Sequence, residues 1–333
     1  MQVVILGKEE SRTADFFSII SRGKTSMQNK KLFGSVSVPD QRVETLSSFF
    51  KPKKTTYTQL SFFSVSTETP SFFEEVKTAD LIVYIVKAFS AYEGDSVNPA
   101  HEIEDFITSL KLKDMEVLER FIQKNKKDLS KSKEVYSATA LLAIIEQAGK
   151  VNKETFLQHD FLKHTALLSA LPLFFVINQD EKDIKDNSLI HDLALAFPDY
   201  PLFSVSTEIE KELLELDQDA YMEFLRAYQI DKPALEILIQ QIYQHLGLIT
   251  FFTVGEDEVR AWTVRKGSNA FESAGKIHTD IQKGFIRAEI VHYDDFNASH
   301  FSFKEAKEKG VFYLEGKDYI LQDGDIMHVR FNI

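Results

Sequence analysis

Short apolar runs alternate with helical patterns over residues 1–99 and again over 167–247. Nearly continuous β-branched or aromatic runs are typical of strands buried on both faces of a parallel sheet, and they occur at Val3–Leu6, Tyr57–Val65, Leu81–Val86, Leu173–Ile177 and, more weakly, Leu202–Val205. Between them, apolar residues recur at helical spacing in 14–20 and 43–50. This alternation predicts an α/β fold with a doubly wound, mostly parallel sheet.

The alternation is interrupted between residues 100 and 166. Apolar residues recur at helical spacing from Ile103 to Phe121, and a second apolar helix is expected over Ala138–Ala148. The polar segment between them carries the lysine-rich run 124–128. We expect an antiparallel helical hairpin inserted into the α/β domain, with the lysine run as its solvated tip.

The pattern changes again in residues 248–333. Strands are expected at Val259–Val264, 284–291 and Asp325–Phe331, with a short helix over 268–274. Glycines separate these segments at turn positions. The segment therefore reads as a small α+β domain.

Composition narrows the class of protein. The chain has 39 Lys and Arg against 51 Asp and Glu, a formal charge of −12, and no cysteine. The missing thiols exclude a disulfide scaffold and a cysteine nucleophile, and the acidic balance disfavours broad binding of DNA, although a local basic patch could still bind RNA. The N-terminus lacks the basic region of a signal peptide, and the longest apolar run, 166–177, is too short to span a bilayer. We expect a cytoplasmic protein without a membrane partner.

Six strings in the last domain closely resemble the TGS domain of the YchF-type Obg-like ATPases: Val259–Val264, Gly275–Asp280, Lys283–Glu289, Tyr293–Phe296, Glu315–Ile320 and Gln322–His328. Upstream segments resemble the same family in the same order, at Ser35–Arg42, Lys51–Lys54 and Ile209–Leu216. The resemblance covers nearly the whole chain. It implies a Ras-like G domain (1–99 and 167–247), a helical coiled-coil insertion (100–166) and a β-grasp TGS domain (248–333). It also implies binding of ATP in preference to GTP, slow magnesium-dependent hydrolysis and association with ribosomes.

The phosphate loop departs from the family pattern. A P-loop, Gly-x-x-x-x-Gly-Lys-Ser/Thr, wraps phosphates with backbone N–H groups, while its Lys contacts the β and γ oxygens and its hydroxyl holds magnesium. Here Gly7 is present, but the later positions are Arg12, Thr13 and Ala14. Glu9 and Glu10 add two carboxylates where phosphates would lie.

A side chain in the left-handed conformation costs on the order of 1–2 kcal/mol, so we expect Arg12 to avoid it and the loop to follow a different path. Ser11 or Thr13 is expected to be the N-cap of the next helix. Lys8 or Arg12 could still supply a substitute charge to a phosphate.

The second phosphate element, Asp-x-x-Gly, is replaced by Ser64–Thr67, and the glycine-rich switch after it by 68–73. Because two phosphate elements have lost their key groups, we predict no catalytic residue, no metal site and no required cofactor.

The base-reading side is better preserved. The segment 178–181 fits the Asn-x-x-Glu that the resemblance associates with adenine, and Ser206 lies at the position of the last base-contacting loop. Asn178, Glu181 and Ser206 are therefore candidate nucleotide contacts. The alternative is that polar residues simply end a buried strand.

The resemblance also implies RNA or ribosome contacts in the TGS domain. The candidates are Lys276, His278, Lys283, Arg287 and Lys317. Residues 249–333 contain 11 basic and 14 acidic residues, so such a contact must be a local patch. His278 could equally be a turn histidine.

Three hypotheses follow. The leading one is a YchF-like pseudo-NTPase that acts as a binding or regulatory adaptor at the ribosome through its TGS domain and helical arm. The alternative is a weakly active enzyme or sensor that binds ATP, or GTP, with magnesium. The third is a protein-interaction module that captures a protein partner through the hairpin.

Overall fold

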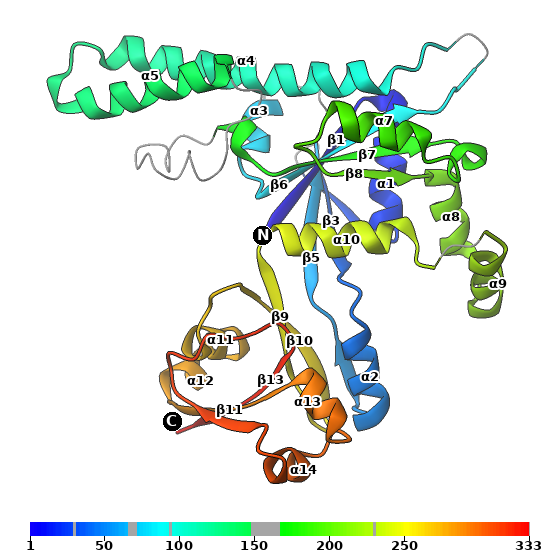
Figure 1. Cartoon of the computed structure of the whole chain (residues 1–333), viewed down its shortest axis with the longest axis vertical. Helices are drawn as coiled ribbons and strands as arrows, with labels where there is room; N and C mark the ends of the chain where they lie inside the picture. Colours follow the sequence, from blue (N-terminus) through cyan, green and yellow to red (C-terminus); the bar gives the residue numbers. More distant parts are fainter. Residues whose placement is uncertain (29–30, 66–71, 93–94, 148–166, 229–230, 333) are drawn as a thin grey trace. The chain divides into compact units, whose positions relative to one another are not determined.

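The chain folds around two sheets, each in its own part of the molecule (Figure 1). This computed structural model describes residues 1–28, 31–65, 72–92, 95–147, 167–228 and 231–332. Residues 1–36 and 61–235 form one compact unit, and residues 37–60 and 236–333 form the other. The two units are described separately below.

The sheet of the first unit has seven strands in the order β2-β3-β5-β1-β6-β7-β8. β1 lies between β5 and β6 and is parallel to both, and β7 and β8 continue the parallel pairing. The strands are β1 Gln2–Gly7, β2 Thr25–Gln28, β3 Lys31–Ser37, β5 Gln59–Ser64, β6 Leu81–Ala88, β7 Leu173–Gln179 and β8 Leu202–Val205. The doubly wound parallel sheet is confirmed, whereas the antiparallel pair β2 and β3 was not predicted.

Helices cover both faces of this sheet. On one face, Val4 of β1 and Tyr84 of β6 pack in one buried cluster with Phe106 of α4 and Leu193 of α7. On the other face, α1 packs against β1 and α8. The helices of this unit are α1 Thr13–Ile20, α3 Phe72–Val76, α4 Pro99–Asn125, α5 Ser132–Gln147, α7 Ser188–Ala196, α8 Thr207–Glu215 and α9 Gln218–Tyr228.

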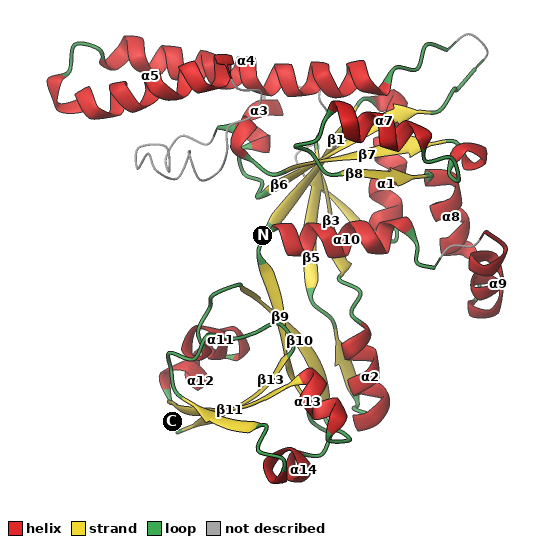
Figure 2. Ribbon diagram, in the orientation of Figure 1, coloured by secondary structure: helices red, strands yellow, loops and turns green. Residues whose placement is uncertain are grey.

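The predicted helical arm is formed by α4 and α5, which lie side by side in Figure 2. Leu118 of α4 and Leu141 of α5 are fully buried between them. At the base of the arm, the buried carboxylate of Asp114 accepts hydrogen bonds from the backbone N–H groups of Leu168 (2.8 Å) and Ser169 (2.7 Å), just before β7. Part of the expected insertion, 148–166, lies outside the described residues.

The sheet of the second unit has six strands in the order β12-β11-β13-β9-β10-β4. They are β4 Lys54–Thr56, β9 Leu248–Thr253, β10 Glu258–Arg265, β11 Phe285–His292, β12 Phe312–Glu315 and β13 Asp325–Phe331. The helices are α2 Gln41–Phe50, α10 Ala234–His245, α11 Ala270–Ile277, α12 Thr279–Lys283, α13 Tyr293–Ala298 and α14 Phe303–Glu308. The strands predicted from alternation, β10, β11 and β13, are present within two residues of the expected bounds.

Residues 37–60, which the sequence analysis grouped with the first domain, pack in the second unit. β4 pairs in parallel with β10, and Val43 and Leu46 of α2 are fully buried against Val259 of β10. The opposite face of the same sheet is covered by α11 through Ala270 and other residues. The domain boundaries stay a prediction, but the packing shows that the segment after β3 completes the second sheet.

None of the helices in the described ranges combines the length and the apolar character that a membrane crossing requires.

Candidate functional site

The loop after β1 occupies the position of the phosphate loop that the resemblance implies. β1 ends at Gly7, residues Glu9–Ser11 form a single 3-10 turn, and α1 begins at Thr13. A Cβ atom on Gly7 would lie 2.8 Å from the carbonyl oxygen of Ile85 and closer still to the hydroxyl of Thr13. The close approach of the loop to β6 therefore requires glycine at this position.

Arg12 adopts the left-handed conformation that the sequence analysis expected it to avoid (φ 58°, ψ 37°). Its Nη1 lies 2.7 Å from Oε1 of Glu208 in α8, and its guanidinium carbon lies 4.3 Å from the ring centre of Phe89. An arginine–carboxylate pair and a cation–π contact together offset a backbone cost of about 1–2 kcal/mol. The same contacts turn the Arg12 side chain toward α8 instead of into the loop.

Thr13 and Ala14 stand where a P-loop has its lysine and its magnesium-binding hydroxyl. Thr13 is 8% exposed, and its hydroxyl donates to the carbonyl oxygen of Lys8 at 3.2 Å. The expectation that Ser11 or Thr13 caps the helix is wrong: the N-cap is Arg12, without a side-chain cap bond, and the Ser11 hydroxyl donates instead to Glu102. Ala14 is exposed and has no side-chain oxygen. The first turn of α1 thus offers neither an ammonium group nor a free hydroxyl to a phosphate.

Asn178, at the end of β7, links this loop to the start of α8. It is 1% exposed, its Nδ2 donates to the carbonyl oxygen of Ser11 at 3.2 Å, and its Oδ1 accepts from the backbone N–H of Thr207 at 3.1 Å. The phosphate loop and the segment that begins α8 were both expected to contact a nucleotide, and one buried side-chain amide joins them. Both polar atoms of Asn178 are engaged inside the protein.

The other two base-side candidates are Ser206 and Glu181. Ser206 directly precedes α8 and is 2% exposed, and its hydroxyl has no hydrogen-bond partner among the described residues. Glu181 begins the 3-10 turn after β7 and is half-buried. The structure brings Asn178 and Ser206 together, because Thr207 follows Ser206 and donates to Asn178.

Two carboxylates near this loop escaped the sequence analysis. Glu102, at the start of α4, is 9% exposed and lies 3.4 Å from the hydroxyls of Ser11 and Tyr84 and from the backbone nitrogen of Lys87. Burial raises the pKa of Glu102, while the nearby Lys8 and the hydrogen bonds act in the opposite direction. The second is Glu208, the partner of Arg12. The sequence offered one signal that Glu102 is buried: it is a charged residue within the apolar helical pattern around Ile103.

The second element of a phosphate site is only partly described. β5 ends at the half-buried Ser64, Val65 is buried, and residues 66–71, where the rest of the Asp-x-x-Gly equivalent and most of the switch would lie, fall outside the described residues. Phe72 begins α3.

The C-terminal candidates are spread over α11, α12, β11 and the loop after β12. His278 is the N-cap of α12, where its Nδ1 accepts from the backbone N–H of Asp280 at 3.2 Å. Lys283 lies 3.5 Å from Asp280, and the Lys317 ammonium lies 5.0 Å from the ring centre of Phe271. Arg287 lies against Gly316 and therefore next to Lys317.

All five candidates, Lys276, His278, Lys283, Arg287 and Lys317, are exposed. His278 has the structural role that the alternative interpretation gave it. Arg287 lies against Gly316, the residue before Lys317, while the Lys317 ammonium itself lies over Phe271.

Comparisons with known proteins agree with the resemblance. A family model for the C-terminal domain of YchF GTPases, described as a protein of unknown function (DUF933), matches residues 248–332. A ribosome-binding ATPase YchF of Bacillus subtilis is 35% identical over 326 residues, which cover 90% of this chain and 89% of that protein. A ribosome-binding ATPase YchF of Pasteurella multocida is 33% identical over 329 residues, with the same coverage.

Solved structures show the same architecture. The YchF GTPase of Schizosaccharomyces pombe superposes with a TM-score of 0.87 at 25% identity, covering 99% of this chain and 97% of that one. A GTP-binding protein from Pyrococcus horikoshii shares the fold, with a TM-score of 0.64 at 18% identity over the whole of both chains. Sequence identity over nine-tenths of the chain and the shared architecture lead to one conclusion: the chain belongs to the YchF family.

Proposed function

We propose that this chain is a pseudo-NTPase of the YchF family, a cytoplasmic adaptor that associates with ribosomes and does not hydrolyse nucleotide at an ordinary rate. One hydrogen bond supports the proposal most strongly. At the position of the P-loop lysine, the Thr13 hydroxyl donates to the Lys8 carbonyl oxygen. A P-loop depends on a cation and a hydroxyl at these positions to bind the phosphates and magnesium.

The charges around the loop support the same proposal. Glu9 and Glu10 are exposed on the turn before α1. Each carboxylate repels a phosphate by roughly 1 kcal/mol at 4 Å even in water. The Arg12 guanidinium, which could have compensated, is paired with Glu208. Lys8 is exposed and could still contact a phosphate, but Thr13 and Ala14 hold the positions of the P-loop lysine and hydroxyl, so no catalytic step is assigned to the loop.

The adaptor part of the proposal rests on the relatives. The curated relatives are named ribosome-binding ATPases, and this chain has the same helical arm and C-terminal domain. We place the contact with ribosomal RNA on the exposed basic residues of the C-terminal domain, which we take to be a TGS domain. Arg287 and Lys317 are the strongest candidates, because Arg287 lies against Gly316, the residue before Lys317.

A second candidate function is nucleotide sensing, with ATP, or GTP, bound with magnesium and little or no turnover. It is favoured by the buried Ser206 hydroxyl, which has no partner among the described residues and lies beside Asn178. A buried hydroxyl normally has a hydrogen-bond partner, and a bound base could supply one.

Calorimetric titration of the full chain with ATP, GTP and ADP, with and without magnesium, separates these functions. The pseudo-NTPase proposal predicts no saturable, magnesium-dependent binding and no phosphate release. Binding without turnover supports the sensor instead. Micromolar binding with steady turnover contradicts the pseudo-NTPase proposal.

Co-sedimentation with ribosomes at low salt tests the adaptor part. The full chain should sediment with ribosomes, and Arg287→Glu combined with Lys317→Glu should weaken the association. Lys304→Glu, which reverses one exposed charge on α14 of the same domain, is a control for charge reversal outside the candidate contact and should have little effect. No association of the unmodified chain would contradict the adaptor part, whereas loss only on deletion of residues 100–147 would favour capture of a protein partner by the arm.

A further inference from the structure

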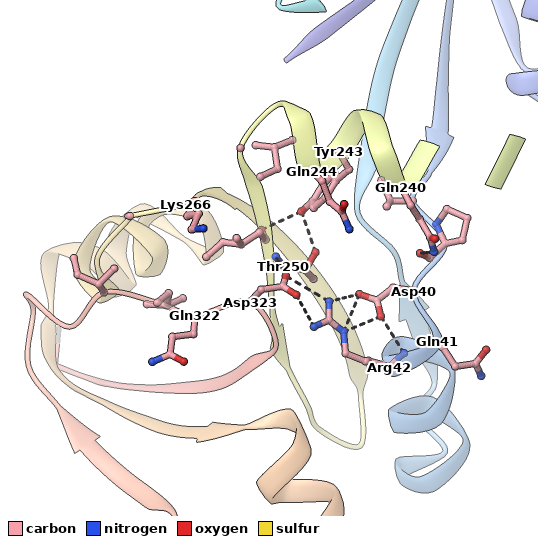
Figure 3. A pocket seen from close by; sticks show the side chains of 18 residues that line it. Asp40, Gln41, Arg42, Gln240, Tyr243, Gln244, Thr250, Lys266, Gln322 and Asp323 are labelled. Carbon is pink, nitrogen blue, oxygen red and sulfur yellow. Dashed lines mark hydrogen bonds and ion pairs between the residues drawn. The ribbon is translucent and has the colours of Figure 1, made fainter. Parts of the chain in front are cut away.

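A cavity of about 780 Å³ opens in the second unit, separate from the loop after β1 (Figure 3). It is bounded by the start of α2, the C-terminal half of α10, the turn between β10 and α11, and the segment before β13. Its volume is within the range of small-molecule sites. Nothing in the proposed account of the phosphate loop or the ribosome contact uses this cavity.

One wall of the cavity is a rigid network of charges centred on Arg42. Its Nε and Nη2 donate to the two carboxylate oxygens of Asp40 at 2.9 and 2.8 Å, and its Nη1 donates to Oδ2 of Asp323 at 2.8 Å. Oδ1 of Asp323 also accepts from the backbone N–H of Thr250 at 2.8 Å. Burial alone would lower the pKa of Arg42, but the hydrogen bonds to both carboxylates outweigh it and raise that pKa above its ordinary value. Two carboxylates around one guanidinium leave this wall with a net charge of −1.

The Asp323 carboxylate is the open part of this wall. Its side chain is 50% exposed, whereas that of Asp40 is 13% exposed. Both Asp323 oxygens accept hydrogen bonds within the protein, from Arg42 and from Thr250, and the carboxylate still stays half-exposed. A cationic group in the cavity would therefore meet a fixed carboxylate that needs no reorganisation.

Lys266 places a positive charge on another side of the cavity. It lies on the turn between β10 and α11, is exposed, and its ammonium has no hydrogen bond or ion pair to any residue in the described ranges. Figure 3 shows Lys266 on this turn and Gln244 on α10, with the Arg42 network below them in the view. Ile320, Leu321 and Leu248 add apolar surface.

The charge pattern selects the class of ligand. The four charged residues that line the cavity, Asp40, Arg42, Lys266 and Asp323, sum to zero. A nucleotide, with two or more negative charges, would have one uncompensated cation to meet and two carboxylates to avoid. A zwitterion matches the two walls, and the Gln240 and Gln244 amides beside it can pair with a peptide group.

We propose that this cavity binds a zwitterion of the amino-acid type, a free amino acid or a short peptide, with its ammonium at Asp323 and its carboxylate at Lys266. The apolar side chain of the ligand lies on Ile320, Leu321 and Leu248. This inference does not depend on the proposed function.

Saturation-transfer-difference NMR on the full chain tests the proposal with the dipeptide alanyl-leucine as the probe. We expect saturable binding in the millimolar range, as befits a small, open site. Two blocked probes each lose one charge: N-acetyl-alanyl-leucine lacks the ammonium, and alanyl-leucinamide lacks the carboxylate. Each should bind roughly tenfold more weakly, because one charge-assisted hydrogen bond is lost. Free leucine in a parallel titration distinguishes an amino acid from a peptide as the better ligand.

Two variants test which side of the cavity binds each charge of the ligand. Lys266→Gln should bind alanyl-leucine and its amide equally, and Asp323→Asn should bind alanyl-leucine and its N-acetyl form equally. Thermal unfolding of each variant shows whether it is folded, which matters for Asp323 because it also contacts Arg42. Lys304→Gln, outside the cavity, should keep both preferences. The proposal is overturned if no probe binds saturably, if the blocked probes bind as well as the dipeptide, or if Lys266→Gln keeps the preference for a free carboxylate.

Discussion

At the scale of single residues, the backbone of Arg12 and its side chain act in opposite directions on stability. The left-handed conformation favours glycine, whereas the contacts with Glu208 and Phe89 favour arginine. Arg12→Ala keeps the backbone cost and loses the contacts, so it should lower the free energy of unfolding by about 1–2 kcal/mol. Arg12→Gly loses the contacts and removes the cost, so it should be more stable than Arg12→Ala by about 1 kcal/mol. Urea denaturation of the three proteins checks this order, and equal stabilities of the two variants would contradict it.

Asn178 is predicted to be a structural residue whatever the chain binds. Replacing it with alanine leaves the Ser11 carbonyl and the Thr207 N–H without their partners in a buried place. Each unsatisfied group costs about 1–3 kcal/mol, so Asn178→Ala should destabilise the first unit by roughly 2–4 kcal/mol. Asn187→Ala, at an exposed asparagine without a cap bond, should change stability little. Denaturation followed by far-UV circular dichroism compares the two, and a similar small change in both would show that the bridge is dispensable.

At the scale of elements, a cross-strand network makes the C-terminal sheet sensitive to acid. Glu289 of β11 accepts from His328 at 3.0 Å and from Nε of Arg330 at 2.9 Å, both on β13. Burial alone would raise the pKa of Glu289, but these hydrogen bonds outweigh it and hold the pKa below its ordinary value of 4.5. A carboxyl group whose pKa is lowered by folding stabilises the protein above its ordinary pKa, and that contribution is lost as the pH falls through the lowered value.

The loss should therefore appear below about pH 4.5, and Glu289→Gln should show a shallower decline in stability over that range. Trp262 is the single tryptophan and lies on β10 of the same sheet, so its fluorescence reports this unit. Glu308→Gln, at an exposed position on α14, should follow the unmodified protein. Parallel pH profiles for the unmodified protein and Glu289→Gln would refute the role given to the network.

The elements that the sequence predicted well can be recognised from their own residues. β1, β6 and β7 are runs of consecutive buried apolar residues, and the pattern alone identifies them. β4 has the sequence Lys-Thr-Thr and no apolar signal, and its place depends on pairing with β10, about two hundred positions later in the chain. Its assignment to the second unit could therefore not be predicted from its own residues.

The features of the candidate site also divide into those that the sequence predicts and those that it does not. The residues at the P-loop positions can be identified from the sequence alone. The sequence therefore showed that Thr13 and Ala14 replace the lysine and the magnesium-binding hydroxyl. What Arg12 does instead could not be predicted, because its partner Glu208 lies 196 positions away and is brought near by the pairing of buried strands. The cavity around Arg42 was hidden for the same reason, since Asp323 is 281 positions from Arg42.

At the scale of the whole molecule, we propose that partner binding and phosphate chemistry depend on different parts of the chain. The architecture of the family is complete, with the α/β unit, the helical arm and the C-terminal domain. The differences that bear on phosphate binding include Arg12, Thr13 and Ala14 in the loop after β1 and Ser64 at the second phosphate element. Restoring the three loop side chains should then restore some phosphate binding without changing the fold.

The variant Arg12→Gly, Thr13→Lys, Ala14→Ser introduces the Gly-Lys-Ser of a P-loop. It should gain weak magnesium-dependent binding of ATP, because Gly7 is already in place and the P-loop lysine and hydroxyl are restored, while Glu9 and Glu10 still repel the phosphates. It should not gain rapid hydrolysis, because Ser64 still stands where the family has an aspartate. Calorimetry and a phosphate-release assay measure the two properties, and a variant that folds but binds no ATP would show that Arg12, Thr13 and Ala14 are not by themselves what limits binding.

The most direct test of the central claim is a calorimetric titration of the unmodified full chain with ATP, in the presence and absence of magnesium, followed by a phosphate-release assay on the same sample. We expect no saturable magnesium-dependent heat and no steady release of phosphate. Saturable micromolar binding that requires magnesium, with steady turnover, would contradict the central claim.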